Sequence, residues 1–195
     1  MLKKITFVTS NKGKVNELQN LLQIEIIPKD IDLPEIQSLD LKEIIEKKAF
    51  EAYKIIQSPV VIEDTSLIFH ALAKLPGTFV KWFLKELGTE GLCRLMNQYK
   101  NKTATAQNMI GLFDGTQISF FSGKIKGTIS PVPKGTNGFG WDALFIPEGQ
   151  YKTYAEMTNK EKMKFSFRKI AVEELKQFLI KAKLETSQSY ISISD

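Results

Sequence analysis

Two neighbouring carboxylates, Glu63 and Asp64, have the side-chain type that acid–base or metal chemistry needs. They end the apolar run VVIED, which predicts a strand, and neighbouring residues of a strand face opposite sides of the sheet. One acid is therefore expected to face a cleft and the other to face away. Because ligands of open α/β sheets gather beyond the carboxyl ends of strands, an acid here could hold magnesium or take a proton from water. The alternative is that it caps the turn after the strand.

Three more acids lie upstream, in a loop that contains a proline: Asp30, Asp32 and Glu35. One of them could meet Asp64 across a cleft and share a metal ion with it; otherwise they are surface charge. With one histidine and one cysteine, the chain excludes the usual His/Cys zinc site. Any metal would have oxygen ligands, which favours magnesium, with manganese as the alternative.

The segment TSNKGK at 9–14 separates a predicted strand from a predicted helix and could bind an anion. It is not a Walker phosphate loop, because valines stand where that motif needs its first glycine and its Ser/Thr. A polar loop at a helix N-terminus still offers free backbone N–H groups and the positive end of the helix dipole to a phosphate. Asn11, Lys12 and Lys14 would add to this. An ordinary solvated loop, with Asn11 as a turn residue, is the alternative.

Two further features have a functional and a structural interpretation. Lys48 projects along the edge of the apolar face of the helix predicted at 41–57, where it either reaches a ligand or extends its head into water. The turn NGFGWD has glycines that let the backbone approach a ligand, beside aromatic rings that could stack on a base. Asp142 could accept a hydrogen bond from a base or a ribose. The alternative is that Phe139 and Trp141 pack back into the core.

The elements that must position these residues alternate between strand and helix in the first half and include a hairpin in the second. This order predicts an α/β fold with a mixed central sheet flanked by helices. Residues 1–183 are expected to form one domain, and the polar segment 184–195 a loose tail. Strands are expected at 4–9, 24–27, 59–66, 104–113, 117–129 and 141–147, and helices at 14–23, 41–57, 79–87, 89–99 and 166–181.

The composition favours a globular protein with an anionic ligand. The net charge is +5 and the pI is about 9.1, but the charges alternate in sign along most of the chain and do not by themselves indicate nucleic acid. Nearly all the positive charge is lysine, with Arg94 and Arg168 as the two arginines. A single cysteine allows no intrachain disulfide, and no segment is long enough to span a membrane, so we expect a cytoplasmic protein.

Taken in order, several motifs resemble the inosine triphosphate pyrophosphatase family, in its eukaryotic branch. They are TSNKGK, DLPE, the helix that carries Lys48, VIEDTSL, LPGTFVKWFL, FGWD, and TYAEM with the lysine-rich run to SFR, and they cover residues 5–179. The resemblance implies an enzyme that hydrolyses deaminated purine nucleoside triphosphates (ITP, dITP and XTP) to the monophosphate and pyrophosphate, which cleanses the nucleotide pool. It also implies a magnesium requirement, a homodimer without nucleic-acid or membrane partners, and two lobes with the active site in the cleft between them.

The resemblance also implies roles for the residues singled out above. Asp64 and Lys14 match catalytic residues. Glu35 and Asp64 match the ligands of the metal ion, and Asp64 is also the expected base for the attacking water. Several lysines converging on a triphosphate make electrostatic sense, because that group is a multiple anion. The substrate contacts are Thr9, Ser10, Asn11, Lys12, Gly13, Lys14, Lys48, Asp64, Thr65, Lys81, Phe139, Gly140, Trp141, Asp142, Lys162, Ser166, Phe167 and Arg168.

Selection of the base is expected near the end of the chain. Arg168 offers only donors, so it suits the 6-oxo group of hypoxanthine or xanthine and opposes the amino group of adenine donor to donor. A desolvated mismatch of that kind costs on the order of 1–3 kcal/mol. The family usually reads Ser-His-Arg where this chain has Ser166, Phe167 and Arg168. Phenylalanine cannot form the histidine's hydrogen bond, and its spacing from Ile170 and Ala171 favours a position that faces the core.

Two alternatives stand beside this hypothesis. In the first, the chemistry is kept but the base preference changes because of Phe167. In the second, the chain is a single-stranded nucleic-acid binding module, in which lysines contact the backbone and Phe and Trp side chains stack on bases. Such a module would need neither Glu35 nor Asp64.

Overall fold

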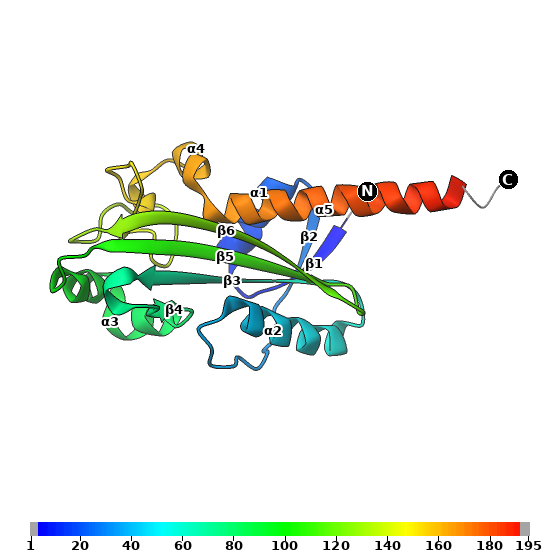
Figure 1. Cartoon of the computed structure of the whole chain (residues 1–195), viewed down its shortest axis with the longest axis horizontal. Coiled ribbons are helices and arrows are strands. Elements are labelled where there is room, and N and C mark those ends of the chain that lie inside the picture. Colours follow the sequence, from blue (N-terminus) through cyan, green and yellow to red (C-terminus); the bar gives the residue numbers. More distant parts are fainter. Residues whose placement is uncertain (1–3, 192–195) are drawn as a thin grey trace.

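The central sheet of the structure, a computed structural model that describes residues 4–191 and the side chains of residues 4–182, has seven strands. They are β1 (Lys4–Val8), β2 (Glu25–Lys29), β3 (Val60–Phe69), β4 (Pro76–Gly77), β5 (Thr103–Phe113), β6 (Ile118–Ile129) and β7 (Phe145–Pro147). Their order is β2-β1-β3-β5-β6-β7, with β4 paired to β3 off this path. β1 runs parallel to β2 and β3, whereas the neighbours from β3 to β7 are antiparallel (Figure 1). The mixed sheet expected from the sequence is confirmed.

Helices cover both faces of this sheet (Figure 1). They are α1 (Lys12–Leu22), α2 (Leu41–Ile56), α3 (Val80–Asn97), α4 (Asn159–Lys162) and α5 (Phe167–Ile191), with 3-10 turns η1 (His70–Leu72), η2 (Tyr154–Glu156) and η3 (Met163–Phe165). α1 and α5 lie on one face, where Leu18 and Leu175 are buried against Val61. α2 lies on the other face, where Ile45 packs against Ile62.

β3 is longer than the sequence indicated, and this changes the place of the two neighbouring acids. The strand expected at 59–66 ends two residues after Asp64, but β3 continues to Phe69 because β5 pairs with it along its whole length. β1 pairs with β3 as far as Val61 and ends at Val8. The acids thus lie in the middle of β3, just past the point at which its parallel neighbour stops.

Other boundaries differ from the expected ones. α1 begins at Lys12, two residues early. β7 covers the three residues Phe145–Pro147, because the first part of the stretch WDALFIP forms a turn. α5 continues to Ile191, well past the expected end at Lys181, so most of the segment expected to be a loose tail is helical. That segment has no glycine or proline to stop a helix. Residues 192–195 of the expected tail lie outside the described residues.

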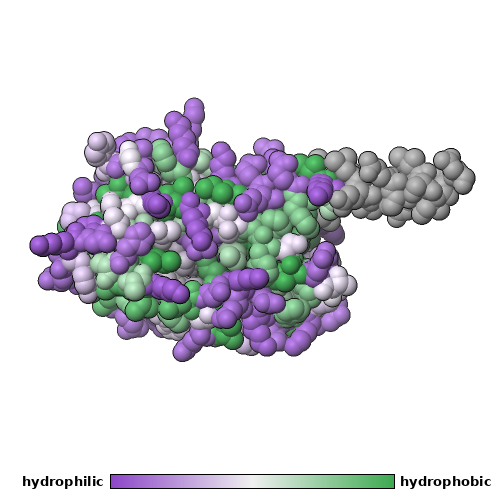
Figure 2. All heavy atoms as spheres, viewed as in Figure 1, coloured by the Kyte–Doolittle hydropathy of each residue, from purple (hydrophilic) through white to green (hydrophobic). Residues whose placement is uncertain are grey.

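α3 contains the break that the sequence predicts. Gly88, at a φ of 65°, interrupts the helical backbone between the two expected helices. Within residues 4–191 no helix combines the length and the apolar character needed to cross a membrane. Figure 2 shows hydrophilic residues spread over this face of the molecule, with smaller hydrophobic patches between them. The two lobes with a cleft, and the domain limit at residue 183, stay predictions.

Candidate active site

Lys48 bridges the two carboxylates that the sequence suggested as metal ligands. Its Nζ donates to Glu35 Oε1 at 2.6 Å and to Asp64 Oδ2 at 3.2 Å. Burial acts to lower the pKa of Lys48, but Asp64 and Glu35 outweigh it and raise the pKa above the usual lysine range. The Lys48 side chain is 13% exposed, so the alternative in which its head extends into water is wrong. α2, β3 and the loop ahead of α2 therefore bring three charged groups into one cluster.

Lys14 of α1 reaches the same carboxylate. Its Nζ lies 3.9 Å from Asp64 Oδ1 and 3.8 Å from Glu63 Oε1, and it donates to the backbone oxygen of Glu63 at 3.2 Å. Asp64 Oδ1 also accepts the backbone N–H of Thr65 at 2.8 Å. Burial acts to raise the pKa of Asp64, but Lys14, Lys48 and this N–H outweigh it and hold the pKa below the usual aspartate range. Asp64 is therefore an anion at neutral pH, with a cation beside each oxygen.

The segment TSNKGK forms the start of α1. Asn11 is the N-cap, and its Oδ1 accepts the backbone N–H of Lys14 at 3.2 Å. Thr9 Oγ1 accepts the backbone N–H of Asn11 at 3.1 Å. Lys12 and Gly13 are therefore helical rather than part of the loop, which explains the early start of α1. The first turn has no acidic residue, so its positive end carries no countercharge of its own.

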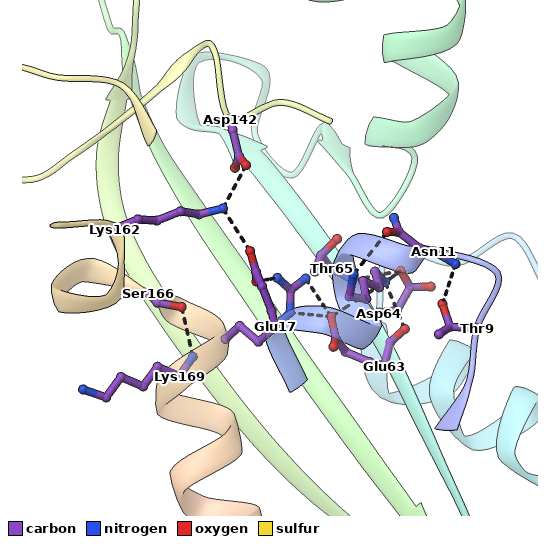
Figure 3. A network of polar contacts seen from close by, with 12 residues as sticks. Thr9, Asn11, Glu17, Glu63, Asp64, Thr65, Asp142, Lys162, Ser166 and Lys169 are labelled. Carbon is purple, nitrogen blue, oxygen red and sulfur yellow. Dashed lines mark hydrogen bonds and ion pairs between the residues drawn. The ribbon is translucent and has the colours of Figure 1, made fainter. Parts of the chain in front are cut away.

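A second and more deeply buried group, the Arg168 cluster, consists of Arg168 and four residues labelled in Figure 3: Glu17, Glu63, Asp142 and Lys162. Arg168 donates to Glu63 Oε1 from Nε at 3.0 Å and from Nη2 at 2.9 Å, and to Glu17 Oε2 from Nη1. Lys162 Nζ donates to Asp142 Oδ2 at 2.8 Å and to Glu17 Oε1 at 3.1 Å. Residues from α1, β3, α4, α5 and the turn before β7 thus meet in one network.

The two clusters meet at β3. Glu63 points toward Arg168 of α5 and Asp64 toward Lys48 of α2, which confirms that the neighbouring acids face opposite sides of the sheet. Lys14 lies within 4 Å of both carboxylates and links the clusters.

Glu17 is the residue of this network that the sequence analysis missed. It follows Lys14 by three residues, and this spacing on one helix face is the signal that could have found it. Burial acts to raise the pKa of Glu17, but Arg168 and Lys162 outweigh it and lower the pKa below the usual glutamate range. Burial also raises the pKa of Asp142, and there Lys162 offsets only part of the effect.

The aromatic residues of the FGWD turn differ in position. The half-buried Phe139 ring lies under the cations, 5.5 Å from Lys162 Nζ and 5.8 Å from the Arg168 guanidinium. Trp141 packs in the core and stacks on Phe167, with ring centroids 5.5 Å apart. Phe167 is 5% exposed, so its predicted core-facing position is confirmed. The structure therefore confirms, for Trp141, the alternative in which the ring packs back into the core rather than stacking on a base.

A cavity of about 450 Å³ adjoins Glu35 and Asp64. Phe79, Trp82 and Phe83, from the start of α3, line it together with Thr78 and the loop ahead of α2. Lys81 is mostly exposed, with its Nζ 3.9 Å from Glu35 Oε2. A larger cavity of about 700 Å³ lies between β6 and α5, away from these charged groups, and among the predicted site residues it touches Ser166. Ser166 Oγ accepts the backbone N–H of Lys169, so it caps α5.

The donors at Glu35 and Asp64 suit a hard divalent cation. Both offer carboxylate oxygens, the ligands that magnesium prefers, and they already hold one cationic group, the Lys48 ammonium, between them. Among the residues that the structure describes, no three His, Cys, Asp or Glu side chains converge as a metal site. An ion at this pair would therefore need other oxygen ligands, such as water or phosphate.

Known proteins resemble the chain over most of its length. The family model described as the Ham1 family matches residues 5–178. The chain is 42% identical over 183 residues to the inosine triphosphate pyrophosphatase of Schizosaccharomyces pombe, covering 92% of this chain and 96% of that protein. It is 36% identical to the dITP/XTP pyrophosphatase of Hyperthermus butylicus, covering 90% and 94%. The solved structure of a HAM1 protein from Coxiella burnetii matches with a TM-score of 0.80 at 26% identity, covering 92% of this chain and 100% of that one.

Proposed function

The chain belongs to the Ham1 family, and we propose that it hydrolyses deaminated purine nucleoside triphosphates (ITP, dITP and XTP) to the monophosphate and pyrophosphate. The relatives named inosine triphosphate pyrophosphatase and dITP/XTP pyrophosphatase support the reaction. The observation that carries the proposal is Asp64, held as an anion between Lys14 and Lys48 at the N-terminal end of α1. This arrangement combines an acceptor for a proton or a metal with cations for phosphates.

The triphosphate would bind where positive charge gathers. Lys14, Lys48 and the mostly exposed Lys81 supply cations, and Ser10, Lys12 and Gly13, at the start of α1, supply backbone N–H groups. Glu35 and Asp64 would hold the magnesium ion, which would neutralise phosphate charge and make the bound phosphorus easier to attack. Asp64 would orient the attacking water and accept its proton.

The base would bind at the Arg168 cluster. Three of the five guanidinium N–H groups donate to Glu63 and Glu17, which fixes the plane of Arg168 and leaves two donors for a 6-oxo group. The exposed part of the Phe139 ring offers an apolar face beside it. Lys162 and Asp142 add a donor and an acceptor for the rest of the base and the sugar.

A panel of triphosphates tests this function. With magnesium present, pyrophosphate release is measured from ITP, XTP, GTP and ATP at matched concentrations. We expect ITP and XTP to react, and ATP to have a kcat/KM at least about tenfold lower because its amino group meets Arg168 donor to donor. Release from none of the four would overturn the proposal.

A second candidate keeps the reaction and changes the base preference. It is favoured by the position of Phe167, whose ring is buried against Trp141 and supplies no hydrogen bond to a ligand. The same panel separates the two, because the first proposal predicts slower release from GTP than from ITP or XTP, whereas this candidate predicts comparable rates for all three.

The remaining expectations belong to the same proposal. They are a homodimer without nucleic-acid partners, residence in the cytoplasm, and magnesium rather than manganese as the working ion. The one described free cysteine, Cys93, is buried, which fits a reducing compartment.

A further inference from the structure

Three buried polar atoms beside the Arg168 cluster have no hydrogen-bond partner within the described part of the chain. They are Glu63 Oε2 and both amide atoms of Asn108, Oδ1 and Nδ2. Asn108 is 0% exposed and interrupts the apolar stripe formed on one face of β5 by Ala104, Ala106 and Ile110. Buried amide and carboxylate groups nearly always have partners, because an unpaired one loses its hydration without compensation.

The register of the sheet brings these atoms together. Asn108 pairs across the β3–β5 ladder with Thr65, and Ile110 pairs with Glu63. Glu63 and Asn108 are therefore diagonal neighbours on the same face of the sheet, with Cβ atoms about 7 Å apart. That separation places their polar ends within reach of a single bridging molecule.

The start of α5 covers this place. Gly123 of β6 lies opposite Asn108. A Cβ added at Gly123 would come 1.9 Å from the backbone oxygen of Phe167, so the helix lies directly on the sheet here. Phe167 and Arg168 are themselves 5% and 3% exposed. The polar atoms are enclosed on all of these sides and need a partner that is itself buried.

We propose that Glu63 and Asn108 hold one buried water molecule beneath the start of α5, and that Asn108 thereby positions Arg168. A water would donate to Glu63 Oε2 and Asn108 Oδ1 and accept from Asn108 Nδ2, the three bonds typical of buried water. It would fix the carboxylate of Glu63, whose other oxygen accepts both Nε and Nη2 of Arg168. This positioning role rests on the proposed function, in which Arg168 contacts the base.

A high-resolution crystal structure tests the site directly. The expected result is electron density for a water within about 2.6–3.2 Å of all three atoms. A direct Asn108–Glu63 hydrogen bond with no such density would overturn the site. This result does not depend on which triphosphate the protein hydrolyses.

The variant Asn108→Leu tests the consequence. Leucine keeps the branched shape and the four side-chain heavy atoms of asparagine, with a larger volume and no polar atom, so Glu63 Oε2 would lose its water. We expect Tm to fall by about 2 °C or more. The ratio of kcat/KM for ITP to that for ATP should fall about tenfold, mainly through a higher KM for ITP, because Arg168 is held less firmly. Asn108→Ser, which keeps a hydroxyl for the water, should retain most of the ratio.

Met109→Leu is the matched control, since Met109 belongs to the same strand but packs with the apolar cluster on its other face. It should keep both Tm and the ratio close to wild type. A rise in Tm for Asn108→Leu would overturn the water site, because removal of a truly unpaired amide stabilises a protein. A lower Tm with an unchanged ratio would overturn the positioning role. A wild type that does not hydrolyse ITP would overturn the proposed function, while density and Tm would still decide the water site.

Discussion

Asp64 has a lysine beside each of its carboxylate oxygens, and its charge is the feature on which the chemistry depends. Asp64→Asn keeps the size of the side chain and removes that charge. We expect kcat for ITP to fall about 10²–10⁴-fold, because an amide cannot take a proton from water and binds magnesium more weakly. Steady-state pyrophosphate release is the measurement.

Asp32→Asn is the control for this variant. Asp32 is an exposed acid in the loop that also carries Glu35, so its substitution should leave kcat within about twofold of wild type. Equal activity in the two variants would remove Asp64 from the reaction. The binding-module alternative predicts instead no pyrophosphate release from wild type, and an affinity for single-stranded nucleic acid that Asp64→Asn keeps or improves.

The lowered pKa of Asp64 makes a prediction for stability against pH. Because folding favours its ionised form, Asp64 contributes stability that is fully present above the pKa of an unfolded aspartate, about 3.9. That contribution is lost as the pH falls through the lower pKa of the folded state. In urea unfolding, the stability difference between wild type and Asp64→Asn should thus be largest near neutral pH and should shrink below about pH 4. A difference that stays constant down to pH 2 would contradict this reading.

The sequence identified individual site residues where a charged residue type stood at a position that is usually apolar. Lys48 on the edge of an apolar helix face and the acid pair after VVI are such cases, and the structure brings Lys48 and Asp64 into contact. Glu17 was missed because an acid on an amphipathic helix is common. Asn108 was also missed, although it stands where the two-residue alternation of Ala104, Ala106 and Ile110 indicates an apolar residue.

At the scale of elements, α1 and the FGWD turn depend on each other. A Cβ added at Gly13 would lie 2.6 Å from Cε1 of Phe139, so Gly13→Ala should push that ring aside. Alanine improves a helix by about 1 kcal/mol over glycine, so stability should hold. We expect KM for ITP to rise roughly threefold or more with kcat little changed, as the ring moves away from the base.

Asn20→Ala, at an exposed position of α1, should leave KM unchanged and serves as the control. If Gly13→Ala has the same KM as this control, Phe139 does not contact the base.

Element types were predictable, whereas several boundaries were not. The hairpin β5–β6 and the break in α3 were predictable because Asp114, Gly115 and Gly88 are residue types that favour turns and helix breaks. β3 extends three residues beyond its expected end at Ser66, because pairing with β5, a tertiary effect, continues as far as Phe69. α5 extends beyond its expected end at residue 181. The polar residues that follow were expected to form a loose tail, but their residue types are also acceptable in a helix.

At the scale of the whole molecule, the site exists because the fold joins distant segments. Glu17 and Lys162 are 145 residues apart in sequence, and Arg168 is 105 residues from Glu63. No local pattern predicts such contacts; the order of the motifs indicated them only through resemblance to a family. The sheet places Lys48 of α2 and Arg168 of α5 on opposite faces of β3, and Lys14 of α1 lies within 4 Å of the carboxylates on both faces.

The most direct measurement is the identity of the products made from ITP. Wild-type protein is incubated with ITP and magnesium, and the phosphorus-containing products are quantified over time. We expect IMP and pyrophosphate in equal amounts, with no IDP, and a rate that collapses in Asp64→Asn. Formation of IDP and inorganic phosphate, or no turnover of ITP by the wild type, would contradict it.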